Sequence, residues 1–198
     1  MIRVVTVFFV IAFVTTAQAQ SLPERFMVTD VASDDVLNIR AEPSSSSDII
    51  GEFGPYTLNV EVLRTRGGWG YTGAGERSGW VSMRYLTPNP VPENELPRPL
   101  ACFGTEPFWD VTFYPRGTEY NFMGEEPVRL SSIREYVAAN GYFVEAMEAP
   151  TISRSIMINA MSCNDGMSDR DFGMSITMFT HSTEGNSVQT GCCTMQVN

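Results

Sequence analysis

"QTGCCTM", residues 189–195, places Cys192 directly beside Cys193 near the C-terminal end of the sequence. Consecutive Cα atoms lie only about 3.8 Å apart, below the usual range for a disulfide, so these two cysteines are not expected to pair with each other. Successive residues on a β-strand point to opposite faces. We therefore predict a strand from which the two sulfurs leave in opposite directions, each toward a different partner.

The first 19 residues have the pattern of a secretory signal. Arg3 supplies a positive start, and "VVTVFFVIAFV" (4–14) is an apolar run too short for a transmembrane helix. Ala17-Gln18-Ala19 fits the small-x-small pattern of a cleavage site, and no Cys follows it to carry a lipid. We expect cleavage after Ala19 rather than an uncleaved anchor, a periplasmic or secreted protein, and no stable membrane insertion.

Cys102 and Cys163 complete an even set of four cysteines, all in the second half of the chain. In an exported protein an even number implies disulfides. The absence of a CxxC pair excludes a thioredoxin-like motif and a zinc-ribbon spacing, and no basic residue flanks "TGCCTM" to activate a thiolate. We predict two structural disulfides, with two connectivities open.

The mature chain is strongly acidic. Without the signal, 12 arginines face 23 acidic residues, a balance of −11, and there is no lysine. Such a surface argues against nucleic acid and against docking on anionic lipid.

A proline-rich stretch, "TPNPVPENELPRP" (87–99), divides the chain and holds five of its twelve prolines. It lacks hydrophobic periodicity and favours an extended conformation. We interpret 88–99 as a linker between a domain at 21–87 and a second domain at 100–198.

The first of these domains shows the two-residue period of strands with one buried face. The stretches 36–43 and 58–63 alternate apolar and polar residues. In the second stretch the pattern buries Leu58 and places Glu61 on the opposite face. Short, closely spaced strands separated by glycine-rich turns predict a small all-β barrel.

"VLNIRAEPSSSSDIIGEF" (36–53) and "GGWGYTGAGERSGWVSMRYL" (67–86) resemble the bacterial SH3-like domain family in their ordered strand and turn motifs. The resemblance covers about 26–86 and departs from the family at Gly54-Pro55, where a Gly commonly precedes the next strand. It implies a barrel of five or six strands. It also implies a binding role, often toward peptidoglycan peptides or envelope proteins.

Four aromatic residues of this domain are candidate ligand contacts, because aromatic-lined grooves suit extended peptides. Small barrels also need large residues to fill their interior, so a structural role stays open for each of them. Trp69 is the main candidate. The set is Trp69, Tyr71, Trp80 and Tyr85.

The second domain also has strand patterns, in 107–115, 155–161 and 173–180. Asn140-Gly141 is a strong hairpin signal, and 131–139 fits a helix or a strand. We predict an antiparallel barrel or sandwich, which makes the fold of the whole chain all-β.

"CFGTEPFWDVTFY", "SCNDGMSDRDF" and "GCC" resemble an uncharacterised family of bacterial envelope proteins, loosely META-like, over most of 100–195. The family carries G-x-EPFW, C-x-DGMSD and a terminal GC, and it has no established activity. Asp171-Phe172 stands where the family frequently has Tyr-Pro. Because the family pairs C-x-DGMSD with GC, the resemblance implies the disulfides Cys163–Cys192 and Cys102–Cys193.

Two motifs of the second domain supply further candidate ligand-binding residues: Glu106 and Trp109 from "GTEPFW", and Asp165 and Asp169 from "DGMSD". A buried Trp with a capping Glu, and an Asx-turn, are the structural alternatives. With Asp171 the carboxylates also suit Ca²⁺, although the EF-hand spacing is missing.

Eight of the eleven methionines lie in the second domain, and Met clusters in exported proteins can bind Cu(I). Met174 and Met178 share a strand face but lie about 13 Å apart, too far to chelate one ion. Core packing is the preferred interpretation, and we predict no metal and no cofactor.

Catalytic motifs are scarce. His181 is the only histidine, and G-x-S-x-G, HExxH and P-loop patterns are absent. We predict an exported, non-enzymatic envelope protein whose SH3-like module binds a peptidoglycan peptide or an extended protein segment. The alternatives are a carboxylate-based cell-wall hydrolase and a Ca²⁺ or Cu(I) binding protein, and the oligomeric state stays open.

Overall fold

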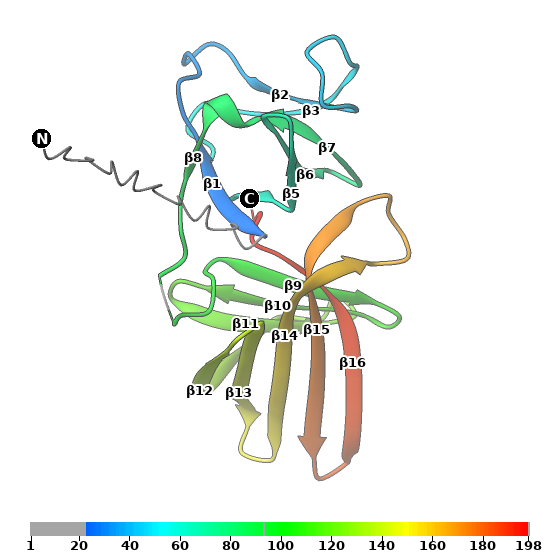
Figure 1. Ribbon diagram of the computed structural model, residues 1–198. Coiled ribbons are helices and arrows are strands. Elements are labelled where there is room, and N and C mark those ends of the chain that lie inside the picture. Colours follow the sequence, from blue (N-terminus) through cyan, green and yellow to red (C-terminus); the bar gives the residue numbers. More distant parts are fainter. Residues whose placement is uncertain (1–22, 93, 198) are drawn as a thin grey trace, which may run out of the picture.

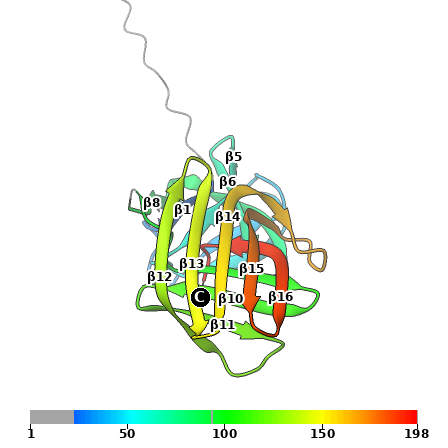
Figure 2. The same ribbon diagram turned by 90° about the horizontal axis from the view of Figure 1, so that it is seen from below.

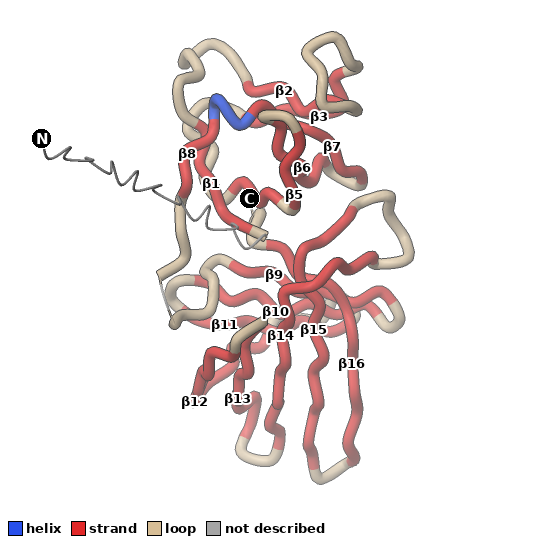
Figure 3. The backbone as a smooth tube through the Cα atoms, viewed as in Figure 1, coloured by secondary structure: helices blue, strands red, loops and turns tan. Residues whose placement is uncertain are grey.

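The structure is a computed structural model and describes residues 23–92 and 94–197. The secretory signal predicted at 1–19 lies outside these residues. Within them the chain forms sixteen strands and one short 3-10 helix, so the all-β prediction is confirmed. The tube in Figure 3 shows strands connected mostly by short loops.

The first domain contains two small sheets that enclose one core (Figure 1). One sheet has the strand order β4-β1-β8 and the other the order β3-β2-β7-β6-β5. The elements are β1 (Glu24–Val28), β2 (Leu37–Arg40), β3 (Ile49–Phe53), β4 (Val60–Val62), β5 (Arg64–Arg66), β6 (Trp69–Ala74), β7 (Arg77–Ser82), η1 (Met83–Tyr85) and β8 (Leu86–Pro88). Leu37 and Ile39 of β2 are both buried in this core, as their alternation predicts.

The second domain, called the barrel below, is a closed barrel of eight antiparallel strands in which each strand pairs with the next. β16 pairs back with β9, so no sheet edge is left open. Seen from below, β12 to β16 follow one another around the wall (Figure 2). The strands are β9 (Leu100–Thr105), β10 (Phe108–Tyr114), β11 (Gly117–Phe122), β12 (Val128–Ala138), β13 (Gly141–Ala149), β14 (Ile152–Asn164), β15 (Asp171–Ser182) and β16 (Gly185–Thr194). The stretch 131–139 therefore belongs mostly to a strand.

The barrel interior is filled by apolar side chains from alternate positions. Val111 and Phe113 of β10, and Met174, Ile176 and Met178 of β15, are all buried in one core. The methionines on this face therefore pack against other apolar side chains. Met is flexible enough to fill the irregular gaps of such an interior.

The hairpin between β12 and β13 turns one residue earlier than predicted. Its turn residues are Ala139 and Asn140, and Gly141 already pairs with Ala138 in the ladder. A Cβ on Gly141 would overlap the carbonyl oxygen of Ile158. The glycine is therefore needed for close strand approach rather than for the turn itself.

Two disulfides, Cys102–Cys193 and Cys163–Cys192, hold the end of β16. Cys193 lies opposite Cys102 on β9, and both side chains belong to the barrel core. Cys192 leaves the other face of β16 and reaches Cys163 on β14. The sulfurs leave in opposite directions, and the pairing is the one that the envelope-protein resemblance implied.

The stretch interpreted as a linker, 88–99, packs against both domains over its described part. Leu96 is only 2% exposed and lies in the barrel core. From β1, the Arg25 guanidinium donates hydrogen bonds to the carbonyl oxygens of Asn89 (2.9 Å) and Arg98 (2.7 Å). These contacts fix the stretch in place between the domains.

The segment that follows β16 covers one face of the first domain. Thr194 donates a hydrogen bond of 2.6 Å from Oγ1 to the Glu61 carboxylate, and the Met195 N–H donates another of 3.3 Å. Glu61 is consequently 2% exposed, whereas Leu58 is 56% exposed. The alternation in 58–63 was therefore misleading at both positions: a distant segment buries the face on which Glu61 was expected to meet solvent, and Leu58 lies before β4 begins at Val60.

A half-buried arginine completes this contact. Arg170 donates from Nη2 to Thr194 Oγ1 (3.2 Å), and its guanidinium lies 4.9 Å from the Phe172 ring. Its Nε is buried and has no hydrogen-bond partner in the part of the chain that the structure describes. Burial raises the pKa of Glu61, while the hydrogen bonds from Thr194 and Met195 and the charge of Arg170 act to lower it.

A second segment of the barrel, the loop between β14 and β15 together with the first residue of β15, also touches the first domain. The Asp171 N–H donates to Ser78 Oγ (2.9 Å), and the Asp171 carboxylate pairs with Arg64 at 3.4 Å. Asp169 forms a backbone bridge with Arg77. Each interface segment therefore adjoins a disulfide: this loop follows Cys163, and the C-terminal segment follows the paired cysteines.

Replacing Cys163 by Ser together with Cys192 by Ala should lower the free energy of unfolding by up to about 3.6 kcal/mol, because the bridge closes a loop of about 30 residues. Urea unfolding measures the change. The matched pair Cys102→Ala/Cys193→Ala opens a longer loop and should lose up to about 4.6 kcal/mol. Equal stability of the first variant and the unmodified protein would contradict a stabilising role.

Glu61→Gln should flatten the dependence of stability on pH. A pKa raised in the folded state means that Glu61 contributes stability below its ordinary value of 4.5, which is lost as pH rises through the raised pKa. Glutamine cannot ionise, so the variant should gain stability relative to the unmodified protein as pH rises. Urea unfolding from acid to neutral pH tests this, with the exposed Glu52→Gln as control, and parallel curves for Glu61→Gln would contradict it.

Candidate functional site

The first domain has a groove of about 560 Å³. The elements that line it lie at the end of this domain away from the barrel (Figure 1). Its walls come from the loop between β1 and β2, from the start of β6, and from η1. Trp69 and Tyr85 supply its aromatic surface, and both side chains are half-buried. The groove therefore joins two of the four aromatic residues that the sequence singled out.

Strand alternation and one glycine position this aromatic pair. On β6, Gly70 is buried toward the core, so Trp69 points to the other face. A Cβ on Gly70 would meet the Met83 sulfur and the Val62 side chain. The missing side chain lets η1 pack closely over β6, which brings Tyr85 into the same groove as Trp69.

The groove carries both signs of charge. Asp30 and Asp35 lie on one wall, and Arg40 and Arg84 also line the cavity. Asp35 accepts a hydrogen bond of 2.8 Å from the Val36 N–H, which fixes its carboxylate locally. An aromatic groove with acidic and basic groups can hold an extended peptide through ring contacts and through paired charges.

Tyr71 and Trp80 form a separate, tilted ring pair at the domain contact. Their ring centroids lie 4.9 Å apart, and the Arg64 guanidinium lies 3.5 Å from the Tyr71 ring. Arg64 in turn pairs with Asp171 of the barrel. The structure therefore divides the predicted aromatic set into a groove pair and a pair that supports the interface.

The "GTEPFW" and "DGMSD" motifs meet at a second cavity of about 570 Å³, between the barrel and the β6–β7 hairpin. Trp109 and Asp165 both line it, together with Glu76 of the hairpin. Trp109 is only 4% exposed, and a Cβ on Gly104 would overlap its indole nitrogen. Glu106 is exposed and does not line the cavity, so the structure does not join it to Trp109.

Asp165 holds the turn of the second motif. Its Oδ1 accepts hydrogen bonds from the N–H groups of Met167 (3.0 Å) and Ser168 (2.9 Å), and both its oxygens accept from Ser168 Oγ. Burial acts to raise the pKa of Asp165, but the hydrogen bonds from Ser168 and Met167 together outweigh it, and the pKa falls. Asp169 is exposed and lies apart, against Arg77.

The carboxylates of this loop do not gather around one point. Among residues 23–92 and 94–197 no group of three or more His, Cys, Asp or Glu residues is placed to hold a metal ion. His181, the single histidine, is exposed near the end of β15.

Several residues at the two cavities escaped the sequence analysis. The charged members of the groove, Asp35, Arg40 and Arg84, come from segments that read as loop or as ordinary strand. Asp110 lines the motif cavity beside Trp109, and burial raises its pKa. For the acidic wall of the groove, the aspartates just before the "LNIR" strand were the available signal.

Comparison with family models assigns the segment that builds most of the groove. Residues 35–87 match the model described as the bacterial SH3 domain. This segment is a bacterial SH3 domain. Trp69, Tyr85 and three of the four charged groove residues lie inside it. No curated protein and no solved structure matches the chain.

The SH3 domain extends beyond the matched segment. β1, which precedes residue 35, pairs with β4 and with β8 and so completes one of its two sheets. The two disulfides of the barrel fit an oxidising, extracytoplasmic compartment, where bacterial SH3 domains also belong. Within the described ranges, no helix has the length and apolar character needed to cross a membrane.

Asp165→Ala should destabilise the protein by about 1 kcal/mol, because the half-buried Ser168 N–H and hydroxyl and the exposed Met167 N–H lose their acceptor. Asp165→Asn keeps the Oδ1 acceptor and should cost clearly less. Urea unfolding of the two variants tests the turn, and an equal loss in both would show that charge, rather than hydrogen bonding, is the main contribution.

Proposed function

We propose that this is an exported, non-enzymatic envelope protein whose SH3 domain binds a peptidoglycan peptide or an extended protein segment. The proposal rests on the groove, where Trp69 and Tyr85 face a cavity of about 560 Å³ with acidic and basic walls. In this proposal the ligand contacts both rings.

Peptides of the cell wall carry carboxylates and amino groups on a short, extended chain. Such a ligand can pair an amino group with Asp30 or Asp35 and a carboxylate with Arg40 or Arg84. The Arg84 guanidinium already lies 5.4 Å from the Tyr85 ring, so a bound carboxylate would sit beside the aromatic surface. Ring contacts supply the affinity, and the charges fix the direction of the chain.

Export is supported from two sides. The first 19 residues have the features of a cleaved signal, which delivers the mature chain to the periplasm or the medium. The disulfides Cys102–Cys193 and Cys163–Cys192 form and persist in such an oxidising compartment.

A carboxylate-based cell-wall hydrolase in the barrel is the second candidate. The motif cavity holds Asp110, whose pKa burial raises, and Asp165, whose pKa is lowered. Two carboxyl groups shifted in opposite directions are the pattern of an acid and base pair. Both Asp165 oxygens already accept hydrogen bonds from Ser168, which favours a structural role for this carboxylate. Zymography on wall preparations separates the candidates: a cleared band lost in Asp110→Asn would establish the hydrolase.

Trp69→Ala in the full-length protein should weaken binding to purified peptidoglycan about tenfold, since a groove aromatic is a typical hot-spot residue. Co-sedimentation at several peptidoglycan concentrations measures the affinity. Tyr56→Ala removes an exposed aromatic ring outside the groove and should leave binding unchanged. The full-length protein is used because Glu61 and Thr72 of the SH3 domain are buried by the C-terminal segment.

Equal retention of Trp69→Ala and the unmodified protein would refute the groove as the binding site. If neither binds peptidoglycan but an extended peptide competes for the groove, the ligand is a protein segment.

A further inference from the structure

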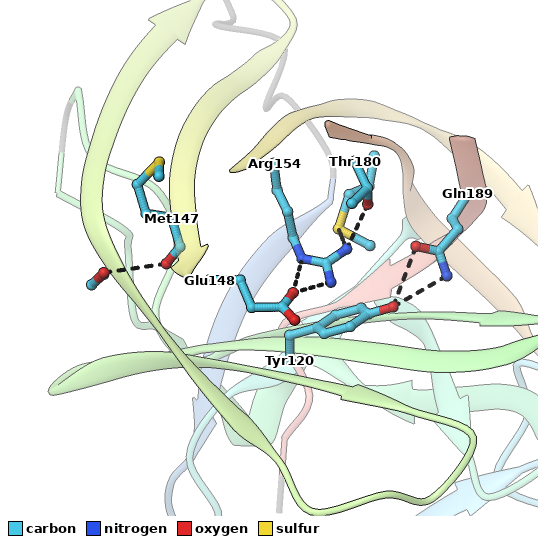
Figure 4. Close-up of polar contacts among 8 residues, drawn as sticks. Tyr120, Met147, Glu148, Arg154, Thr180 and Gln189 are labelled. Carbon is cyan, nitrogen blue, oxygen red and sulfur yellow. Dashed lines mark hydrogen bonds and ion pairs between the residues drawn. The ribbon is translucent and has the colours of Figure 1, made fainter. Parts of the chain in front are cut away.

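The barrel interior changes from apolar to polar toward the end that lies away from the SH3 domain, where the β13–β14 and β15–β16 hairpins close (Figure 1). Ile156 and Met178 are fully buried in the apolar part. Arg154 lies two residues from Ile156 on the inward face of β14, and Thr180 lies two residues from Met178 on the inward face of β15. Arg154 and Thr180 are opposite each other in the register of the two strands. Figure 4 shows Arg154 and Thr180 close to Tyr120, Glu148 and Gln189.

A cavity of about 410 Å³ opens at this polar end, called the barrel mouth below. Apolar side chains, including Phe122 and Val128, form part of its wall, and Glu125 and Glu126 stand at its rim. An eight-stranded barrel has an interior just wide enough for packed side chains or for one small ligand. At the barrel mouth the side chains no longer fill the interior, and the cavity is large enough for a small ligand.

Arg154 is the most buried charge of the barrel mouth, at 5% exposed. Its Nε and Nη2 donate to Glu148 Oε2, its Nη1 donates to Thr180 Oγ1 at 2.6 Å, and its guanidinium lies 3.5 Å from the Tyr120 ring. The cation is therefore matched by a carboxylate and stacked on an aromatic face. It keeps little capacity for an anionic ligand, which would have to displace Glu148.

Other polar groups of the barrel mouth are only partly used. The second oxygen of Glu148 accepts no hydrogen bond from residues 23–92 or 94–197. The Tyr120 hydroxyl and the Gln189 amide meet at 3.4 Å, a long hydrogen bond that a ligand can replace at little cost. These groups line the cavity and offer acceptors to a ligand that donates hydrogen bonds.

The charge around the cavity favours a cation. Arg154 neutralises Glu148, so Glu125 and Glu126 leave the lining with a net charge of −2. A carboxylate or phosphate would be repelled there, whereas an ammonium group would be attracted and can donate to the free Glu148 oxygen. Contact with the apolar wall would bury the hydrocarbon part of the ligand away from water, and this burial would supply the larger part of the affinity.

We infer that the barrel mouth binds a small amphiphile with an apolar body and an ammonium group. The body lies against Phe122 and Val128, and the ammonium group lies between Glu148 and the rim glutamates. This site is separate from the SH3 groove and does not depend on the function proposed for it.

Three probes with the same hydrocarbon chain test the inference: octylammonium, octanol and octanoate. Calorimetric titration of the full-length protein below the aggregation limit of each probe should show saturable 1:1 binding of octylammonium. Octanoate should bind at least about tenfold more weakly than octylammonium. Added salt should reduce this preference for octylammonium, because the rim charges are exposed.

Variants locate the binding. Ser187→Trp places a large ring at the barrel mouth and should abolish octylammonium binding, whereas Asn186→Trp, on the opposite face of β16, should leave it intact. Glu125→Gln/Glu126→Gln should bring octylammonium affinity close to that of octanol, without touching the core.

Several results would overturn the inference. These are no octylammonium binding, equal binding of octanoate or octanol, or unchanged binding in Ser187→Trp. If the double glutamine variant still preferred octylammonium to octanol as strongly as the unmodified protein does, the rim glutamates would not be the source of the selectivity for a cation.

Discussion

The burial of Glu61 against Thr194 and Met195 is the contact on which the arrangement of the two domains depends. A carboxylate removed from water is costly unless its oxygens find donors, and here each oxygen has one. Those donors belong to the segment after β16, so the SH3 domain is completed by the other end of the chain. Gln196 adds to the same contact by donating to the carbonyl oxygen of Gly73 (3.2 Å). The domains therefore form one structural unit.

The disulfides extend this constraint into the barrel. The interface segments on the barrel side are short and would fray if they were held only by their own contacts. Cys163–Cys192 joins the strand before the interface loop to the strand that ends in the C-terminal segment, and Cys102–Cys193 joins the latter to β9. Reduction would therefore loosen the domain contact as well as the barrel. The adjacent cysteines at the end of β16 therefore stabilise both the barrel and the contact between the domains.

Local patterns predicted what depends on local physics. Alternation identified the strands, their inner faces and the opposite directions of Cys192 and Cys193, and the SH3 motifs located the groove aromatic Trp69. The pattern around Glu61 failed because a segment more than a hundred residues away covers that face, and no local signal records such burial. Arg154 was missed for a related reason. In the sequence, a basic residue on a strand is expected to face solvent, and only the closed barrel shows that Arg154 points inside.

The packed stretch between the domains has a mechanical consequence. The SH3 groove and the barrel mouth lie at opposite ends of the molecule (Figure 1). Because 88–99 is fixed by Arg25 and Leu96, the distance between these ends is set by the fold and cannot adjust as it would across a flexible tether. Ligands bound at the two proposed sites would therefore be held at a separation that the fold sets.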